Sequence, residues 1–305
     1  MGAHSLIITF VIDDKYLHQL LFVLYRCALN SIRDHSYVIF FKDLGEISAA
    51  KVRQLASLLN IRVQLIQIKE LHSSFDNGHI ARSSMLRLSV PHYLSQTYMH
   101  LDVDTLPLMG WDNIESFSPS ADEILSAAPI SSLYLEETSA QNEAVRVMGA
   151  DYFQTGVYLL NPIGWNQYML SDRVNDALNE YSDLGFQFSD QCILNYSIQR
   201  RYRKMPEAYN TFPSQFRFKT TRIIHFAGPN KPWILNYPRH FIILFRHSIS
   251  ARQTLSLLFK GNFFSAFHGF LLRFGNFIRE FYCLFFYKIC YLRFKKLFRT
   301  LNFNA

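Results

Sequence analysis

The chain has 305 residues, 49% of them hydrophobic and 16% aromatic, which is enough for the packed core of one large α/β domain. Its formal net charge of +7 is unevenly spread, because residues 239–305 carry eleven Lys and Arg against the single acid Glu280, while residues 1–238 carry twenty basic against twenty-three acidic side chains. We therefore expect a slightly acidic globular body over residues 1–238 and a basic, aromatic tail over residues 239–305. Such a tail favours an anionic surface as its partner.

Several protein classes are excluded by simple patterns. The four cysteines form no C-x-x-C pair, so a zinc ribbon or a redox motif is not expected, and a disulfide scaffold does not fit a chain this long. The N-terminal apolar run stops at Asp13 without a preceding basic region, which argues against a signal peptide. The longest uncharged stretch of the tail, residues 261–272, is shorter than the roughly 20 residues that cross a bilayer. A reducing cytosol is the expected compartment.

Short apolar runs and helical periodicities alternate through the first third of the chain. This alternation predicts a mostly parallel sheet, in which ligands bind beyond the carboxyl ends of the strands. A further helix, broken by Pro91, is expected over residues 81–94. The strands are predicted at residues 6–11, 37–41, 62–68 and 98–108, and the helices between the first three at residues 16–32 and 48–59.

Two aspartates, Asp102 and Asp104, lie in the stretch "YMHLDVDTLPL" after an apolar run. In extended backbone, alternate side chains point the same way, so the two carboxylates are expected to share one cation such as Mg²⁺ or Mn²⁺. A solvated loop is the plain alternative. A second alternative is a phosphatase of the haloacid dehalogenase type, which "HLDVDTL" resembles, with Asp102 as nucleophile and Asp104 as general acid. That family needs a later acidic pair, but the pair Asp13-Asp14 lies upstream.

Six blocks in order decide among these alternatives. They are "VIDDKY", "MLRLSVP", the D-x-D stretch, "DYFQTGVYLLNPIGW", "FSDQCILN" and "IIHFAGPNKPW". Together they resemble the family 8 retaining glycosyltransferases, and within it the bacterial lipopolysaccharide galactosyl- and glucosyltransferases, over about residues 6–235. The resemblance implies a nucleotide-sugar-binding α/β domain of the A type, which is Rossmann-like. It also implies a UDP-galactose or UDP-glucose donor, a lipid-linked saccharide acceptor and a Mn²⁺ or Mg²⁺ ion.

The resemblance also implies roles for individual residues. Asp102, Asp104 and His225 match the metal ligands. Donor-binding residues would be Asp14 at the uridine, Arg87, Asp102, Gln154, Gly228 at the pyrophosphate and Lys231 at the phosphates. Asp190 and Gln191 match the D-Q pair near the anomeric carbon, and with Lys231 they would form the catalytic set.

The chain departs from the family pattern at three positions. Gln154 stands where the family usually has Asn, Cys192 stands where Asp is common, and Ser131 stands where related enzymes often carry an acceptor-contacting Asp. The donor-binding residues are therefore expected to be intact, whereas the acceptor is expected to differ from that of the related enzymes. Because the amide of Gln191 is a poor nucleophile, same-face attack by the acceptor is favoured over a covalent intermediate.

The tail repeats phenylalanines at alternating spacings of three and four from Phe267 to Leu284, followed by "KICYLRFKKLFR". This pattern predicts a helix lying on the surface of an anionic membrane, peripheral on the inner face of the cytoplasmic membrane. A helix packed on the body is the alternative, and the two can coexist. No nucleic-acid motif accompanies the basic residues, so a nucleic-acid partner is not expected.

Overall fold

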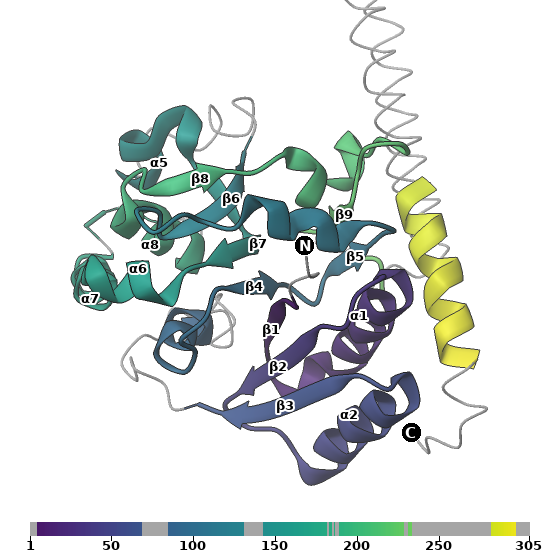
Figure 1. Ribbon diagram of the computed structural model, residues 1–305. Coiled ribbons are helices and arrows are strands. Elements are labelled where there is room, and N and C mark those ends of the chain that lie inside the picture. The colour runs from purple at the N-terminus through teal and green to yellow at the C-terminus, as the bar shows by residue number, and fades with distance from the viewer. Residues whose placement is uncertain are drawn as a thin grey trace, which may run out of the picture.

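The computed structural model describes residues 5–68, 85–130, 143–181, 183–184, 186, 189–228, 231–233 and 282–296. Within them the main sheet has seven strands in the order β3-β2-β1-β4-β7-β6-β8, and β5 and β9 form a separate two-stranded sheet (Figure 1). The strands are β1 Ile7–Ile12, β2 Ser36–Phe41, β3 Arg62–Gln67, β4 Tyr98–Leu101, β5 Thr105–Pro107, β6 Leu125–Pro129, β7 Phe153–Leu160, β8 Tyr202–Lys204 and β9 Ile223–His225.

The first half of the sheet is parallel and is built from the predicted strand–helix repeats. β1 pairs in parallel with both β2 and β4, and β2 pairs in parallel with β3. β7 runs antiparallel to β4 and to β6, and β6 is parallel to β8. The prediction of a mostly parallel α/β sheet is confirmed. The antiparallel β7 brings the middle of the chain directly beside the carboxyl end of β4.

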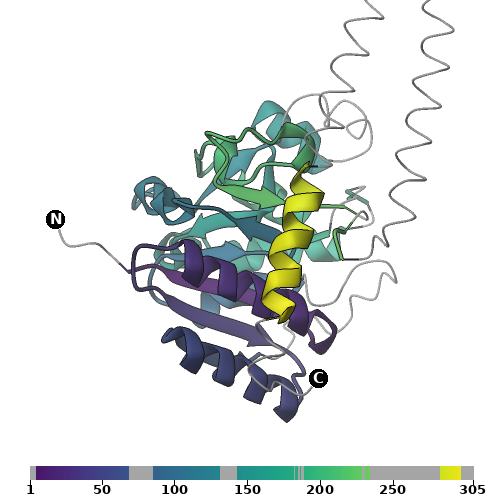
Figure 2. The ribbon, with the colours of Figure 1, turned by 90° about the vertical axis from the view of Figure 1, so that its right-hand side faces the viewer.

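Helices cover both faces of this sheet (Figures 1 and 2). Alternation along β2 sends Tyr37 and Ile39 into one buried cluster and Val38 and Phe40 into the other, as expected for a strand covered on both sides. The helices are α1 Leu17–Asn30 and α2 Glu46–Leu59 against the first cluster, and α5 Glu143–Met148, α6 Pro162–Gln167, α7 Leu170–Asn179 and α8 Ser189–Ile198 against the second.

Two sequence-based expectations need correction. The predicted fourth strand does not run through residues 98–108, because a turn at residues 102–104 separates β4 from β5, which belong to different sheets. In the described part of the stretch expected to be helical, residues 85–86 are helical and a 3-10 helix, η2, follows over Arg87–His92 and includes Pro91. A 3-10 turn tolerates this proline where a continuous α-helix would lose a hydrogen bond.

The described part of the basic tail, residues 282–296, is a helix that packs beside α1 (Figure 2). Its inner face is buried, with Tyr287 1% exposed and its ring 4.8 Å from Phe22 and 5.2 Å from Phe226. Phe294 packs on Phe22 and Tyr25 in the same way. Most of the predicted phenylalanine stripe, Phe267 to Phe281, lies outside the described residues. No helix among those the structure describes is both long and apolar enough to cross a membrane.

Candidate active site

The D-x-D turn is anchored to the strands on either side of it. The amide of Asp102 donates to the carbonyl of Gly156 on β7, at 2.9 Å, and the amide of Phe226, next to β9, donates to the carbonyl of Asp104, also at 2.9 Å. The Thr105 hydroxyl donates to the carbonyl of Asp102 at 2.7 Å and closes the turn. The extended geometry expected for this stretch is therefore wrong. Its two carboxylates still converge, because the turn is tied to β7 on one side and to β9 on the other.

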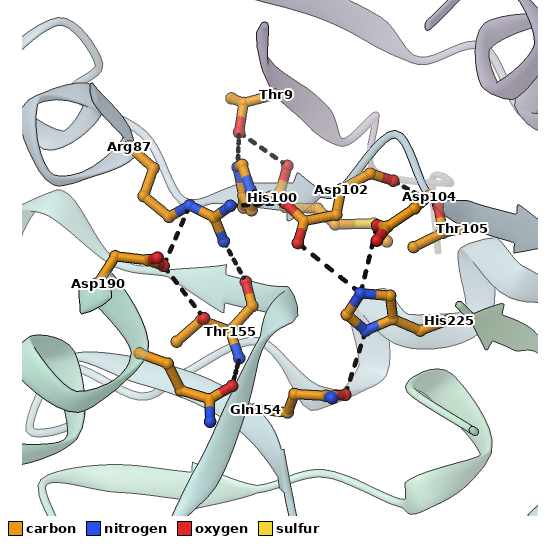
Figure 3. Close-up of polar contacts among 12 residues, drawn as sticks. Thr9, Arg87, His100, Asp102, Asp104, Thr105, Gln154, Thr155, Asp190 and His225 are labelled. Atoms are coloured by element: carbon orange, nitrogen blue, oxygen red, sulfur yellow. Dashed lines mark hydrogen bonds and ion pairs between the residues drawn. The ribbon is translucent and has the colours of Figure 1, made fainter. Parts of the chain in front are cut away.

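His225, the last residue of β9, faces both carboxylates (Figure 3). Its Nε2 lies 3.3 Å from an oxygen of Asp104 and 3.8 Å from an oxygen of Asp102. One ligand atom from each of the three residues lies within 4.8 Å of the others. Gly156 makes this approach feasible, since a Cβ there would lie 2.0 Å from Cε1 of the imidazole.

Positive charge surrounds the two aspartates. Arg87 donates to Asp102 at 2.8 Å, and Lys231 donates to Asp104. Burial opposes ionisation of Asp102, but Arg87 and then His100 and His225 outweigh it and hold its pKa well below the usual range. Burial also opposes ionisation of Asp104, but the nearby His225 and Lys231 outweigh the effect of burial, so the pKa of Asp104 is lowered too. Both carboxylates are therefore ionised at neutral pH.

His100, on β4, is a site residue that sequence reasoning missed. Its Nε2 lies 3.1 Å from Asp102, and burial, followed by the charge of Arg87, lowers its pKa. An ionised carboxylate only accepts hydrogen bonds, so the neutral ring carries its proton on Nε2 and donates it to Asp102. The place of His100 two residues before Asp102 on a strand is the signal that could have found it, because alternate strand residues share a face.

The three residues expected to bind metal fit a divalent cation by the chemistry of their donors. Two ionised carboxylates and one imidazole nitrogen supply oxygen and nitrogen ligands, a set compatible with Mn²⁺ and, through the carboxylates, with Mg²⁺. Among the described residues this is the one cluster of three or more His, Cys, Asp or Glu side chains with such spacing. Lys231 forms a salt bridge with Asp104, so its ammonium group lies beside the same cluster.

A second network lies next to the cluster and contains Asp190 of α8. Arg87 bridges the two, with Nε 3.3 Å from Asp190 and its terminal nitrogens on Asp102 and on the carbonyl of Thr155 (Figure 3). The Thr155 hydroxyl donates to Asp190 at 3.2 Å. Burial raises the pKa of Asp190, and the nearby charge of Arg87 only partly offsets it. The structure thus joins Arg87, Asp102 and Asp190 through a single guanidinium.

Gln191 is held at both ends of its amide. Its oxygen accepts from the Thr155 amide at 3.4 Å, and its nitrogen donates to the Tyr152 hydroxyl at 3.2 Å. That hydroxyl lies 3.3 Å from the sulfur of Cys192, one of the three positions at which the chain departs from the family pattern. The buried Cys192 thus supports the tyrosine that orients Gln191.

The other predicted donor residues lie around the same edge of the sheet. Gly228 adopts a φ of +88°, which a residue with a side chain rarely takes, and Lys231 also donates to the carbonyl of Phe226 at 2.9 Å. Asp14 follows β1, the strand beside β4, and its carboxylate accepts from the Gly45 amide at 3.3 Å. Within the described residues, Asp14 makes no hydrogen bond or ion pair with Asp102, Asp104 or His225. Ser131 lies outside the described residues.

Comparisons with a family model and with known proteins point to the same family. The model of glycosyl transferase family 8 matches residues 7–236, about three quarters of the chain, and ends before the basic tail begins. A putative glycosyltransferase of Haemophilus influenzae is 21% identical over 248 residues, covering 76% of this chain and 74% of that protein. Over 114 residues the chain is 27% identical to a lipopolysaccharide 1,2-glucosyltransferase of Escherichia coli, covering 32% of this chain and 34% of that one.

A solved structure shares the fold. The galactosyltransferase LgtC, solved with donor and acceptor sugar analogues, superposes with a TM-score of 0.65 at 21% identity, over 75% of this chain and 89% of that one. These matches support a transferase and give no support to the phosphatase alternative. The family expected from the six sequence blocks is therefore confirmed, and the chain belongs to glycosyl transferase family 8.

Proposed function

We propose that this glycosyltransferase moves a hexose, galactose or glucose, from its UDP-sugar to a lipid-linked saccharide acceptor such as the core of a lipopolysaccharide or lipooligosaccharide, with retention of anomeric configuration. The observation that carries the proposal is the convergence of Asp102, Asp104 and His225 within 4.8 Å, beside Arg87 and Lys231. Two ionised carboxylates flanked by two cations suit a site that binds a metal ion together with a diphosphate. The lipopolysaccharide glucosyltransferase among the relatives supports the acceptor class.

The proposed metal ligands are Asp102, Asp104 and His225. A bound Mn²⁺ or Mg²⁺ would supply Lewis-acid neutralisation of the diphosphate leaving group. Lys231 lies on the same carboxylate cluster and would neutralise the negative charge that grows as the nucleotide departs. Gly228, with its positive φ, keeps the nearby backbone free of a side chain where the pyrophosphate is expected.

Arg87, Asp190 and Gln191 are proposed to orient the sugar. The guanidinium ties Asp190 to Asp102, so the acid near the sugar and the acid near the phosphates are held at a fixed separation. The amide oxygen of Gln191 accepts a backbone hydrogen bond, and the amide is neutral, which makes it a weak nucleophile. This favours attack by the acceptor hydroxyl on the same face from which the nucleotide departs.

A panel of UDP-sugars tests the donor. UDP release with Mn²⁺, with and without candidate saccharide acceptors, should single out UDP-galactose or UDP-glucose, and anomeric analysis of the product should show retention. A chelated control and a set of GDP-sugars complete the panel. Equal turnover of GDP-sugars, or undiminished transfer after chelation, would contradict the proposed donor class or the proposed metal.

We also propose that the tail attaches the enzyme to an anionic membrane surface, peripheral on the cytoplasmic side. Of helix 282–296, Tyr287 and Phe294 face the body, whereas Tyr282, Phe285 and Leu292 are exposed together with Arg293 and Lys295. A helix with one face docked and an aromatic, basic outer face can pack on the body and contact a membrane at the same time. The proposed boundary between the two parts stays near residue 238.

Vesicle co-sedimentation tests this attachment. Arg293→Glu with Lys295→Glu should weaken binding to anionic vesicles without lowering the thermal midpoint, because both side chains are exposed. Truncation after Pro238 should lower the midpoint, because it uncovers Phe22 and Phe226 where Tyr287 packs. Failure of the intact chain to bind anionic vesicles at low salt would contradict the attachment.

A further inference from the structure

A short turn on the body of the protein carries an aromatic side chain at its tip. Phe218 is 78% exposed and lies between Arg217 and Lys219 in the segment "FRFKTTR", which precedes β9. A single exposed apolar residue is ordinary on a protein surface. Phe218 differs because both flanking basic residues are exposed too, and within the described part of the chain neither basic side chain forms a hydrogen bond or an ion pair.

Hydrogen bonds hold this turn in one shape. The backbone amides of Thr220 and Thr221 donate to the carbonyl of Arg217 at 3.2 and 2.9 Å, and the Arg217 amide donates to the Thr221 hydroxyl at 3.0 Å. The turn is therefore closed on itself, and it presents the Phe218 ring to solvent. Because the backbone is already ordered, burying this ring against a partner costs little further backbone entropy.

The turn lies against the start of helix 282–296. The rings of Phe216 and Tyr282 are stacked, with their centroids 5.9 Å apart. Tyr282 and Phe285, three residues apart on the helix, are 43% and 47% exposed. The exposed aromatic residues of the helix thus begin beside the turn that carries Phe218. Helix 282–296 and β9 lie on the side of the molecule opposite α6 (Figure 1).

Both elements carry only positive charge. The segment 211–222 has three Lys or Arg residues and helix 282–296 has four, with no Asp or Glu in either. Aromatic rings among basic side chains suit the surface of an anionic bilayer, where rings reach the edge of the hydrocarbon and cations contact phosphates. A protein partner would need a pocket shaped for the projecting ring, whereas a fluid bilayer accepts the ring without one.

We infer that the turn 216–221 is a second membrane contact, in which Phe218 enters the interface of an anionic bilayer while Arg217 and Lys219 contact lipid phosphates. The inference rests on the proposed attachment of the tail and extends that attachment to the catalytic body. Two contacts fix the orientation of the body on the membrane, which a tail alone does not.

This orientation has a consequence for the site. The turn leads into β9, and Phe218 precedes His225 by seven residues, a stretch that spans about 25 Å at most. The proposed metal cluster therefore lies within that distance of the inferred contact. Such a placement suits an acceptor whose sugars project from the bilayer that holds its lipid.

A tryptophan placed at the tip of the turn tests the contact directly. Phe218→Trp in the full chain is mixed with vesicles of equal parts phosphatidylglycerol and phosphatidylcholine. Its emission should shift to the blue, and it should be quenched when the lipids carry brominated acyl chains. Wild-type spectra are subtracted to remove the native tryptophans. An unquenched tryptophan at this position in a chain that does bind the vesicles would overturn the inference and leave the tail attachment standing.

Ile163→Trp is the matched control for this experiment. Ile163 is 67% exposed on α6 and has no basic residue beside it in the sequence. Its tryptophan should show neither the blue shift nor the quenching, because α6 lies on the opposite side of the molecule from helix 282–296 (Figure 1). Equal quenching at both positions would show unspecific adsorption and would overturn the inference.

Side-chain variants measure what the turn contributes. Phe218→Ser should weaken partition into the same vesicles by roughly 10-fold, and Phe218→Leu should recover most of that loss. Arg217→Gln with Lys219→Gln should weaken binding at low salt, with a loss that shrinks as salt rises. Ile163→Ser should leave partition unchanged. Thermal midpoints should match wild type in every variant, because all of these side chains are exposed.

The remaining outcomes separate this inference from the proposals on which it rests. Unchanged partition in Phe218→Ser would overturn the inference alone. A full chain that binds no anionic vesicles would overturn both the inference and the tail attachment, whereas UDP release without vesicles tests the transferase by itself. If Phe218→Ser instead alters the sedimentation of the lipid-free protein, the turn joins two copies of the chain and the membrane contact is refuted.

Discussion

Two histidine–aspartate pairs lie at opposite ends of the central sheet. At the carboxyl end, Nε2 of His225 lies 3.3 Å from Asp104, and at the amino end, Nε2 of His35 lies 3.5 Å from Asp112. All four residues are largely buried. The pairs differ in what faces the other ring nitrogen. Nδ1 of His225 faces two amide oxygens, whereas Nδ1 of His35 accepts from the backbone amide of Leu6 at 3.2 Å.

The two pairs also differ in the charges around them, because His225 faces Asp102 as well as Asp104, and Lys231 contacts Asp104. A backbone N–H fixes a lone pair on Nδ1 of His35, so its proton lies on Nε2 and points at Asp112, which also accepts from Ser31 at 2.9 Å. This pair links the start of β1 to η3, Trp111–Phe117, and is structural. The pair at the other end belongs to the cluster of Asp102, Asp104 and His225. The same two residue types thus serve packing at one end and are proposed to bind a metal ion at the other.

The largest effect is expected from Asp104→Asn. Replacing one carboxylate removes a proposed ligand and a negative charge, so Mn²⁺ affinity should fall by at least about 100-fold and transfer should be lost. Asp112→Asn is the matched change at the structural pair and should leave Mn²⁺ affinity intact. Calorimetry with Mn²⁺ and an assay of UDP release compare the two. Retained metal-dependent transfer in Asp104→Asn would refute the assigned ligand set.

Lys231 distinguishes the pair at the carboxyl end from the pair at the amino end, because its ammonium group contacts Asp104. Lys231→Ala should reduce kcat by roughly 10²–10³-fold and change the donor KM less, since the charge it offsets develops in the transition state. Lys231→Arg should recover only part of kcat, because a planar fork replaces a compact point charge. Steady-state kinetics against UDP-sugar separate the two parameters. An effect confined to KM would show that Lys231 acts only in ground-state binding.

Gly156→Ala tests the close approach of His225 to β7. A Cβ at this position would lie 2.0 Å from the imidazole, so the ring must leave its present place beside the carboxylates, and Mn²⁺ affinity should drop about 10-fold or more. Gly149→Ala is the control, because a Cβ there meets nothing within 4 Å and costs only the strain of a φ of +55°. Both variants should have lower thermal midpoints, but only Gly156→Ala should bind Mn²⁺ more weakly.

The smallest expected effect is a pH dependence of stability at His35. Burial lowers its pKa below the ordinary value of 6.5, outweighing the opposing influence of Asp112. The unfolded chain therefore binds this proton more readily, and stability should fall as pH drops below about 6.5 toward the folded pKa. His35→Asn keeps an acceptor for Leu6 and removes the titration. Its midpoint should be lower than wild type at pH 7.5, with a gap that narrows as pH falls to 5.5.

Mn²⁺ affinity at pH 7.5 should be the same for His35→Asn and wild type, since the two pairs lie at opposite ends of the sheet. A widening gap on acidification would contradict the assignment of His35 as a buried neutral group. Weakened Mn²⁺ binding would show instead that the two ends are coupled.

The sequence by itself determined the α/β class, the alternation of strands and helices up to β3, and the family. These follow from local periodicity and from six ordered blocks, both of which are read along the chain. It also named Asp102, Asp104 and His225 together, although the first two lie more than 120 residues from the third. The extended geometry assumed for the D-x-D was wrong, because pairing of β5 with β9 bends the chain there.

Tertiary structure alone decided the surroundings of His225. Its Nδ1 contacts Gln154 and Asn210, which come from β7 and from the segment before β9, and its position depends on the missing side chain of Gly156. It also decided that helix 282–296 docks through Tyr287 on Phe226. Neither result follows from local pattern, because the partners of a buried ring and the docked face of a helix are fixed by atoms that only folding brings within hydrogen-bond or packing distance.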